Sequence, residues 1–288
     1  MKRVIKLHLV GAVAIATLLA ACDVKDPIYN TPHPEHGKIT LTTEWDGIGE
    51  GLTVPESYTV CIGDYTTTVS GTTNTLNRHF APGTYRMLIY NTPENIRFEG
   101  TVADAIVGDT YNPGWLFSYS TEVMISKDTD HAFTAVMQQQ VRELTLVIEP
   151  TGETIDRIES ITGTLSGVAA SLDIADGTHG TPSNVAMTFS KITSGMDAGK
   201  WSATVRLLGT AGAEQWLNVD LFFTNGNPTP VRIKSDLTTA LAAFNTNKRT
   251  PLTLGGSVVE TPTGAGFGAT IDDWTAGNGD GEDIDANM

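Results

Sequence analysis

Apolar and polar residues alternate in many short segments of this chain, a period that is typical of strands with one buried face. In the first such segment Ile39, Leu41, Thr43 and Trp45 fall on one side and polar residues on the other. The pattern returns, between turns rich in Gly, Pro and Asn, at residues 58–62, 85–89, 115–119, 131–137, 144–148, 155–165, 185–189, 201–207 and 217–223. Short strands at this spacing predict an all-β fold of β-sandwiches.

A polar run, Gln138-Gln139-Gln140, interrupts the strand pattern near its middle. Central strands of a sandwich rarely carry such a run, so it predicts a boundary between two successive sandwich domains of the Ig or transthyretin type. We expect an N-terminal domain at 37–140 and a C-terminal domain at 141–275. Residues 276–288 are glycine-rich and acidic, which favours a flexible tail.

One segment of the second domain has a helical pattern. Ser235 is placed to cap it, Asp236 suits the positive end of a helix, and Leu237, Leu241 and Phe244 follow at i, i+4 and i+7. The pattern predicts a single short helix over Asp236 to Asn245. Segments 251–260 and 268–274 then complete the domain as late strands.

The N-terminus has the organisation of a secretory signal. A basic start, residues 1–6, precedes an apolar stretch at 7–19 that is too short to span a membrane comfortably. It ends in Leu19-Ala20-Ala21-Cys22, which resembles the bacterial lipobox. This resemblance implies that signal peptidase recognises Leu19, Ala20 and Ala21, that residues 1–21 are removed, and that Cys22 is acylated. The alternative is an ordinary signal peptide with a chance cysteine.

Residues 22–36 contain three prolines and predict an extended tether between the lipid and the first domain. The whole chain has a formal charge of −15, and loss of the basic signal segment makes it more negative still. So acidic a chain has no general attraction for phosphate, which excludes nucleic acid as a partner. Lipidation leaves Cys61 as the single free cysteine, which we expect to be a small packed residue.

No residue pattern indicates catalysis, so we expect no enzymatic activity. The segment 163–167 has the wrong serine spacing for a nucleophile elbow, and 264–268 lacks the spacing and the βαβ setting of a dinucleotide loop. His33 and His36 lack further metal ligands nearby. The acidic run 278–285 resembles a calcium loop, but its register fails and no bidentate glutamate closes it. We therefore expect no cofactor and no metal.

Five tryptophans offer an alternative function, the binding of surface glycans. Trp45, Trp201 and Trp216 lie in strand patterns and are expected in the core. Trp115 and Trp274 are the candidates for exposure, and Trp115 follows the turn Asn112-Pro113-Gly114.

The complete pattern resembles the fimbrial anchor and accessory lipoproteins of Bacteroidales. Three parts of the chain carry the resemblance: the lipobox, the segment from Pro82-Gly83-Thr84-Tyr85 to Asn91, and the late region comprising 236–245, 248–254 and Ile271-Asp272-Asp273-Trp274. It implies two successive β-sandwiches and a lipid-anchored protein of the outer membrane, on a face that the sequence leaves open. The implied role is to anchor or cap a fimbria-like appendage, or to act as an accessory adhesion subunit.

The resemblance also implies a partner, a fimbrial subunit held by β-strand pairing. Stalk subunits of this family are cut after a basic residue and lose the lipid, whereas anchor subunits keep it. Here the tether region has only Lys25 and Lys38, and no arginine of the mature chain precedes Arg78. This departure from a stalk subunit favours a retained lipid.

Overall fold

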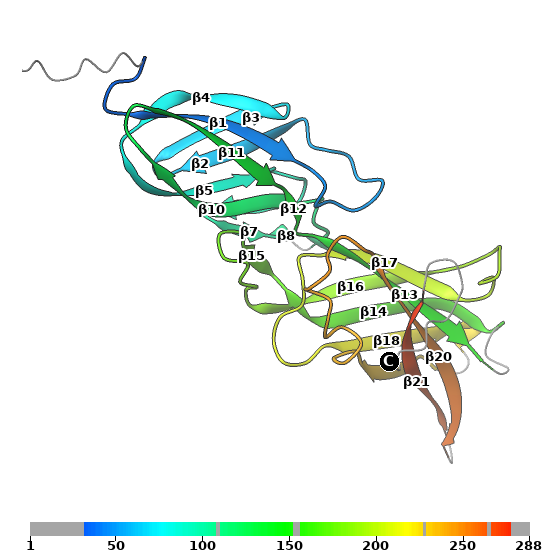
Figure 1. The fold of residues 1–288 in the computed structure, drawn as a ribbon. Coiled ribbons are helices and arrows are strands. Elements are labelled where there is room, and N and C mark those ends of the chain that lie inside the picture. The colour runs from blue at the N-terminus through cyan, green and yellow to red at the C-terminus, as the bar shows by residue number, and fades with distance from the viewer. Residues whose placement is uncertain (1–31, 108–109, 152–155, 227–228, 264–265, 278–288) are drawn as a thin grey trace, which may run out of the picture.

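In this computed structural model, residues 32–107, 110–151, 156–226, 229–263 and 266–277 are described. They form two β-sandwiches that lie end to end (Figure 1). The predicted all-β fold is confirmed. The predicted segments at 58–62, 85–89, 131–137, 144–148 and 201–207 all lie in strands, apart from Met137, which follows the end of one.

The N-terminal sandwich consists of a three-stranded and a five-stranded sheet. The first has the order β11-β1-β4, with β1 parallel to β11 and antiparallel to β4, and the second has the order β12-β10-β5-β2-β3. Their strands are β1 (Gly37–Glu44), β2 (Ser57–Ile62), β3 (Tyr65–Ser70), β4 (Thr73–Phe80), β5 (Gly83–Tyr90), β10 (Phe117–Ile125), β11 (Thr129–Val136) and β12 (Gln138–Gln139). The fully buried Ile39 and Leu41 of β1 belong to one core cluster with Val60 and Ile62 of β2.

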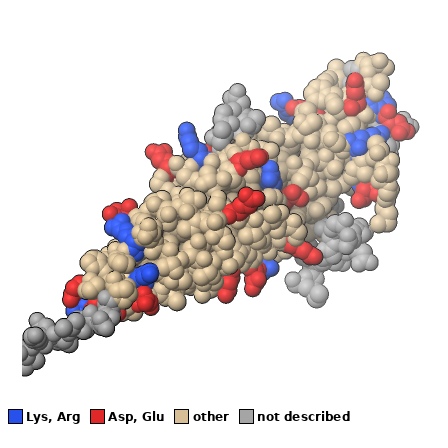
Figure 2. All heavy atoms as spheres, turned by 90° about the horizontal axis from the view of Figure 1, so that it is seen from above, with Lys and Arg blue, Asp and Glu red and all other residues tan. Residues whose placement is uncertain are grey.

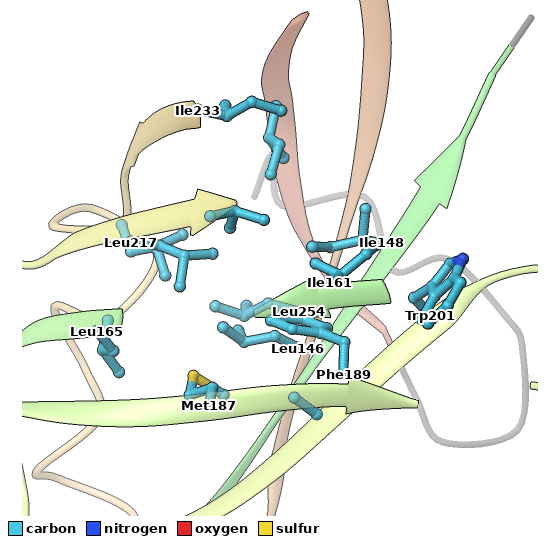
Figure 3. Packing of buried hydrophobic residues seen from close by; sticks show 14 of the residues in the cluster. Leu146, Ile148, Ile161, Leu165, Met187, Phe189, Trp201, Leu217, Ile233 and Leu254 are labelled. Atoms are coloured by element: carbon cyan, nitrogen blue, oxygen red, sulfur yellow. The ribbon is translucent and has the colours of Figure 1, made fainter. Parts of the chain in front are cut away.

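The C-terminal sandwich is built from one continuous eight-stranded sheet in the order β19-β18-β14-β16-β17-β13-β20-β21. Its strands are β13 (Arg142–Pro150), β14 (Ile158–Ala169), β16 (Pro182–Lys191), β17 (Trp201–Leu207), β18 (Trp216–Phe223), β19 (Val231–Asp236), β20 (Leu252–Thr263) and β21 (Gly266–Gly277). Figure 3 shows side chains such as Leu146, Phe189 and Leu217 converging from different strands into one core.

The two ends of this sheet come together. Ser235 Oγ on β19 donates to the carbonyl of Ile271 on β21 (3.0 Å), and Trp274 Nε1 donates to Ser235 Oγ (2.7 Å). The sheet therefore folds back until its first and last strands are tied by side chains. The predicted tail overlaps this region, because Ala276 and Gly277 belong to β21.

Smaller elements join the two sandwiches. A three-stranded sheet, β15-β7-β6, pairs β15 (Ser171–Asp173) of the second half with β7 (Val102–Asp104) of the first. The other short strands are β6 (Arg97–Glu99) and the hairpin β8 (Ile106–Val107) and β9 (Thr110–Tyr111). A 3₁₀ turn, η2 (Thr224–Gly226), lies apart from these, between β18 and β19. Backbone pairing across the junction, together with a shared apolar cluster that includes Leu116, Leu172 and Leu208, makes it a packed interface.

The predicted helix over Asp236 to Asn245 is not present. The segment is instead a series of turns after β19, in which only Leu241 N to Leu237 O is an i+4 hydrogen bond. Ser235 does not cap a helix, since it lies within β19. The apolar residues that suggested a helix face, Leu237, Leu241 and Phe244, are nevertheless buried.

Tertiary contacts explain why turns replace the helix. The guanidinium of Arg142 donates to the carbonyls of Phe244 (3.0 Å) and Thr250 (2.7 Å), which fixes the end of the segment from outside. Asn245 exchanges hydrogen bonds with the backbone of Thr210 in a neighbouring loop. Asp236 accepts a hydrogen bond from Thr238 N, as an N-cap residue does, but the chain beyond it does not continue as a helix.

Several predicted features lie outside the described residues, among them the lipobox Leu19–Cys22 and the acidic run 278–285. None of the described segments is a helix of the length and apolarity that a membrane span requires. The predicted domain boundary stays a prediction. In the structure the chain leaves the five-stranded sheet after Gln139 and enters the eight-stranded sheet at Arg142.

Candidate functional site

The sheet edges are the first candidates, because an edge strand presents unpaired backbone N–H and C=O groups to a partner. Among the longer edge strands, β19 carries Arg232 and Lys234, and β11 carries Asp130 and His131. The strand β4 carries Arg78 and His79, and its pairing with β1 is interrupted by a register shift. Charges and irregular pairing are features that protect an edge against further pairing.

The edge strand β3 lacks these features. Its sequence, Tyr-Thr-Thr-Thr-Val-Ser, contains no charged residue, no proline and no glycine, and it pairs in unbroken register with β2. Charges lie beyond both of its ends: Arg78 forms an ion pair with Asp64 (2.8 Å) and lies over the Tyr65 ring, and Glu56 precedes Ser57, the partner of Ser70. The strand β3 is therefore the least protected of these edges.

The turn that precedes β3 determines which of its backbone groups face outward. Gly63 and Asp64 form a two-residue loop between the paired residues Ile62 and Tyr65. Such a loop closes on a hydrogen-bonded pair, so alternate residues from Tyr65 onward bond to β2. The backbone groups of Thr66, Thr68 and Ser70 consequently face away from the sheet.

A second candidate is a cleft of about 700 Å³ between the two sandwiches. Its walls come from the loop after β1, which includes Glu50 and Leu52, and from the segment before β20, which includes Asn247 and Arg249. Trp115 and Glu143 also line it. The two walls are more than 190 residues apart in the sequence.

Gln139 holds both walls of the cleft. This buried side chain accepts a hydrogen bond from Gly49 N (2.8 Å) and donates to the carbonyl of Lys248 (2.6 Å). Arg249 Nε also donates to the carbonyl of Ile48 (3.3 Å). A Cβ at Gly49 would lie 2.6 Å from the Arg249 carbonyl, so this close approach of the two walls requires glycine.

A partly buried basic pair lies close to the cleft. Lys248 Nζ is 3.4 Å from both His179 Nε2 and Gln140 Oε1. Burial lowers the pKa of Lys248 to about 8. Burial and then the neighbouring lysine lower the pKa of His179. No group of three or more His, Cys, Asp or Glu side chains in the described part of the chain is placed to hold a metal ion.

The last residues of the predicted tether pack against the first sandwich. His33 is buried, and its ring nitrogens lie 2.9 Å from the His36 carbonyl and from the carboxylate of Asp130. Burial lowers the pKa of His33, but these hydrogen bonds outweigh it, so the pKa is raised. The tether region is thus fixed to β11 before β1 begins.

The tryptophans differ in part from expectation. Trp201 is buried and Trp45 packs against the first core, as predicted. Trp216 is only half-buried, and Lys234 lies over its ring. Trp115 and Trp274, the candidates for exposure, are both half-buried, and only Trp115 lines the cleft.

Sequence reasoning missed the other cleft residues. Gln139 was assigned only to a boundary, and Glu143 and Arg249 carried no signal because nothing in their local pattern differs from a solvated strand or loop. Cys61 is partly buried against the junction cluster, in agreement with its prediction as a packed residue.

No family model matches the sequence, and no curated protein matches it either. The structure is similar to a candidate adhesin from Bacteroides ovatus, with a TM-score of 0.58, 17% identity, and coverage of 81% of this chain and 92% of that chain. Another candidate adhesin from Bacteroides ovatus gives a TM-score of 0.59 at 13% identity, covering 88% of this chain and 96% of that one.

The fimbrial anchor protein Mfa2 from Porphyromonas gingivalis has a TM-score of 0.52 and 12% identity, with 81% of this chain and 95% of that chain covered. These likenesses show that the fold is shared over most of each chain. They confirm the fold that the resemblance to fimbrial anchor and accessory proteins implied.

Proposed function

We propose that this chain is a non-enzymatic lipoprotein of the outer membrane that anchors or caps a fimbria-like appendage, or serves as its accessory adhesion subunit. The observation that carries the proposal is the shared fold with Mfa2 and with the candidate adhesins over more than nine-tenths of their length. The lipobox residues Leu19 to Cys22 support a lipid anchor at the N-terminus.

We further propose that a fimbrial subunit pairs with the edge strand β3. Strand addition draws affinity from backbone hydrogen bonds, which need a long edge without charge or proline. The strand β3 meets this condition with outward-facing backbone groups at Thr66, Thr68 and Ser70. Acidic and basic side chains are interspersed on the face shown in Figure 2, which favours a backbone contact over an attraction between large patches of opposite charge.

The test compares two adjacent proline variants. Thr68→Pro removes an N–H that faces outward, so it should abolish co-purification of fimbrial subunits and leave the fold intact. Thr67→Pro removes an N–H directed at β2, so it should destabilise the sandwich. Co-purification that persists with folded Thr68→Pro would contradict the pairing at β3.

The lipid anchor has its own test. Cys22→Ser removes the acylated thiol, and the variant should move completely from the detergent to the aqueous phase in phase partitioning, or stay unprocessed. Cys61→Ser is the matched control and should partition like the wild type. A Cys22→Ser protein that has lost its signal segment and still enters the detergent phase would refute the anchor.

A further inference from the structure

The cleft between the two sandwiches has no role in pairing at β3, and its geometry is preformed. Gln139 ties Gly49 on one wall to Lys248 on the other, and Arg249 reaches back to Ile48. The floor is part of a packed junction, since Trp115 contacts the apolar clusters of both the first sandwich and the interface. Binding of a ligand would therefore lose little free energy in ordering these walls.

The lining combines one indole with polar groups that are free to bind. Arg206 lies over the Trp115 ring, 5.6 Å from its centroid, which restricts the orientation of the indole. The side-chain carboxylates of Glu50 and Glu143 have no hydrogen-bond or ion-pair partner among the described residues. Arg249 uses Nε for the Ile48 carbonyl, so its other guanidinium N–H groups remain available.

These groups suit a sugar ring. A pyranose offers apolar C–H groups to an indole, and its hydroxyls both donate to carboxylates and accept from guanidinium or amide N–H groups. Glu143 and Glu50 would accept, while Arg249 and Asn247 would donate.

Other ligand classes fit less well. Leu52, Trp115 and Pro251 are the sizeable apolar side chains of the lining, too few for the hydrophobic anchors of a peptide or a lipid. An anionic sugar would meet two carboxylates against the single guanidinium of the lining, Arg249, in a chain of net charge −15. We propose that this cleft binds a neutral oligosaccharide, with a sugar ring against Trp115 and its hydroxyls on Glu143, Asn247 and Arg249.

The experiment uses the full chain in a detergent without a sugar headgroup, because a glycosidic detergent would compete for the cleft. The protein is applied to an array of neutral oligosaccharides, built from hexoses, N-acetylhexosamines and fucose, and of sialylated and uronic-acid oligosaccharides. The affinity for the strongest neutral ligand is then measured by calorimetry. We expect binding to neutral members of the array and weaker or no binding to the anionic ones.

Variants place the binding in the cleft. Trp115→Ala should weaken binding by about tenfold or more, which corresponds to the loss of about 1.4 kcal/mol. Trp216→Ala, which changes a half-buried tryptophan outside the cleft, should leave the affinity within about twofold. Because Trp115 also supports two apolar clusters, Glu143→Gln and Asn247→Ala serve as variants that spare the core, and each should weaken binding several-fold.

Three outcomes would overturn the proposal. The first is that no neutral oligosaccharide binds the wild type, and the second is that only anionic ones do. The third is that the affinity is unchanged in both Glu143→Gln and Asn247→Ala. The test is separate from pairing at β3, because Thr68→Pro should bind the oligosaccharide normally.

Discussion

The two sandwiches of this protein differ in whether their sheet edges are tied to other strands. The C-terminal sandwich folds one eight-stranded sheet back on itself until Ser235 on β19 bonds to Ile271 on β21. The N-terminal sandwich stacks two separate sheets and leaves the uncharged edge β3 unpaired. Exposed edges invite association, so natural proteins protect the edges that are not used for binding. The uncharged edge lies in the first sandwich, which is where we propose that another chain pairs.

Two arginines, one in each sandwich, also differ in how far they are tied into the structure. Arg142 in the second is buried and donates to three backbone carbonyls, whereas Arg78 in the first is partly exposed and pairs with Asp64. Arg142→Ala would leave buried carbonyls without a partner, and we expect a loss of about 3 to 5 kcal/mol in the free energy of unfolding. Arg78→Ala should cost at most about 1 kcal/mol.

Urea denaturation of both variants measures this difference. Similar losses in the free energy of unfolding for Arg78→Ala and Arg142→Ala would show that the buried arginine does not organise the turns at 237–250. The two arginines would then not distinguish the two sandwiches.

Alternation of apolar residues predicted the strands that have one fully buried face. Leu144, Leu146 and Ile148 illustrate this, since a period of two places all three in the core. The strand β3 was missed because its inward face has only Tyr65 and Val69 as apolar residues, separated by Thr67, and both are only partly buried. So weak a buried stripe gives little hydrophobic signal.

The helix prediction failed for a different reason. Leu237, Leu241 and Phe244 have helical spacing and are buried, but Arg142 and Asn245 impose turns through contacts with distant segments. Local pattern is a weak guide where tertiary hydrogen bonds compete with it. Nothing in the sequence indicated the cleft either, because Gln139 and Lys248 come together only in the folded chain and neither has a local pattern that marks a site.

The junction between the sandwiches should respond to alkaline pH through Lys248. Its pKa is about 8 in the folded protein and near 10.4 in the unfolded chain. Between these values the unfolded state binds more protons, so the free energy of unfolding should rise with pH, by roughly 2 kcal/mol from pH 8 to 10.5.

Lys248→Met is the matched control, since it keeps the length of the side chain and removes the titrating group. Chemical denaturation at several pH values should show a smaller rise for the variant than for the wild type. Parallel curves would mean that Lys248 is not held in a desolvated position at the junction.

The smallest effect concerns the closure of the C-terminal sheet. Ser235→Ala removes the hydroxyl that joins Trp274 Nε1 to the Ile271 carbonyl, and it leaves a half-buried indole N–H without its partner. We expect a loss of about 1 to 2 kcal/mol in the free energy of unfolding. Thr68→Ala on the open edge β3 changes a side chain that forms no hydrogen bond among the described residues, so it should cost less than about 0.5 kcal/mol.

Hydrogen exchange read by mass spectrometry locates the effect. In Ser235→Ala the amides of β19 and β21 should exchange faster, because the two ends of the sheet are no longer tied, while the amides of β2 and β3 should be unchanged. If β19 and β21 keep their protection, the side-chain ties do not close the sheet. Its ends would then be as open to a partner as β3, and strand pairing would have to be sought at both sandwiches.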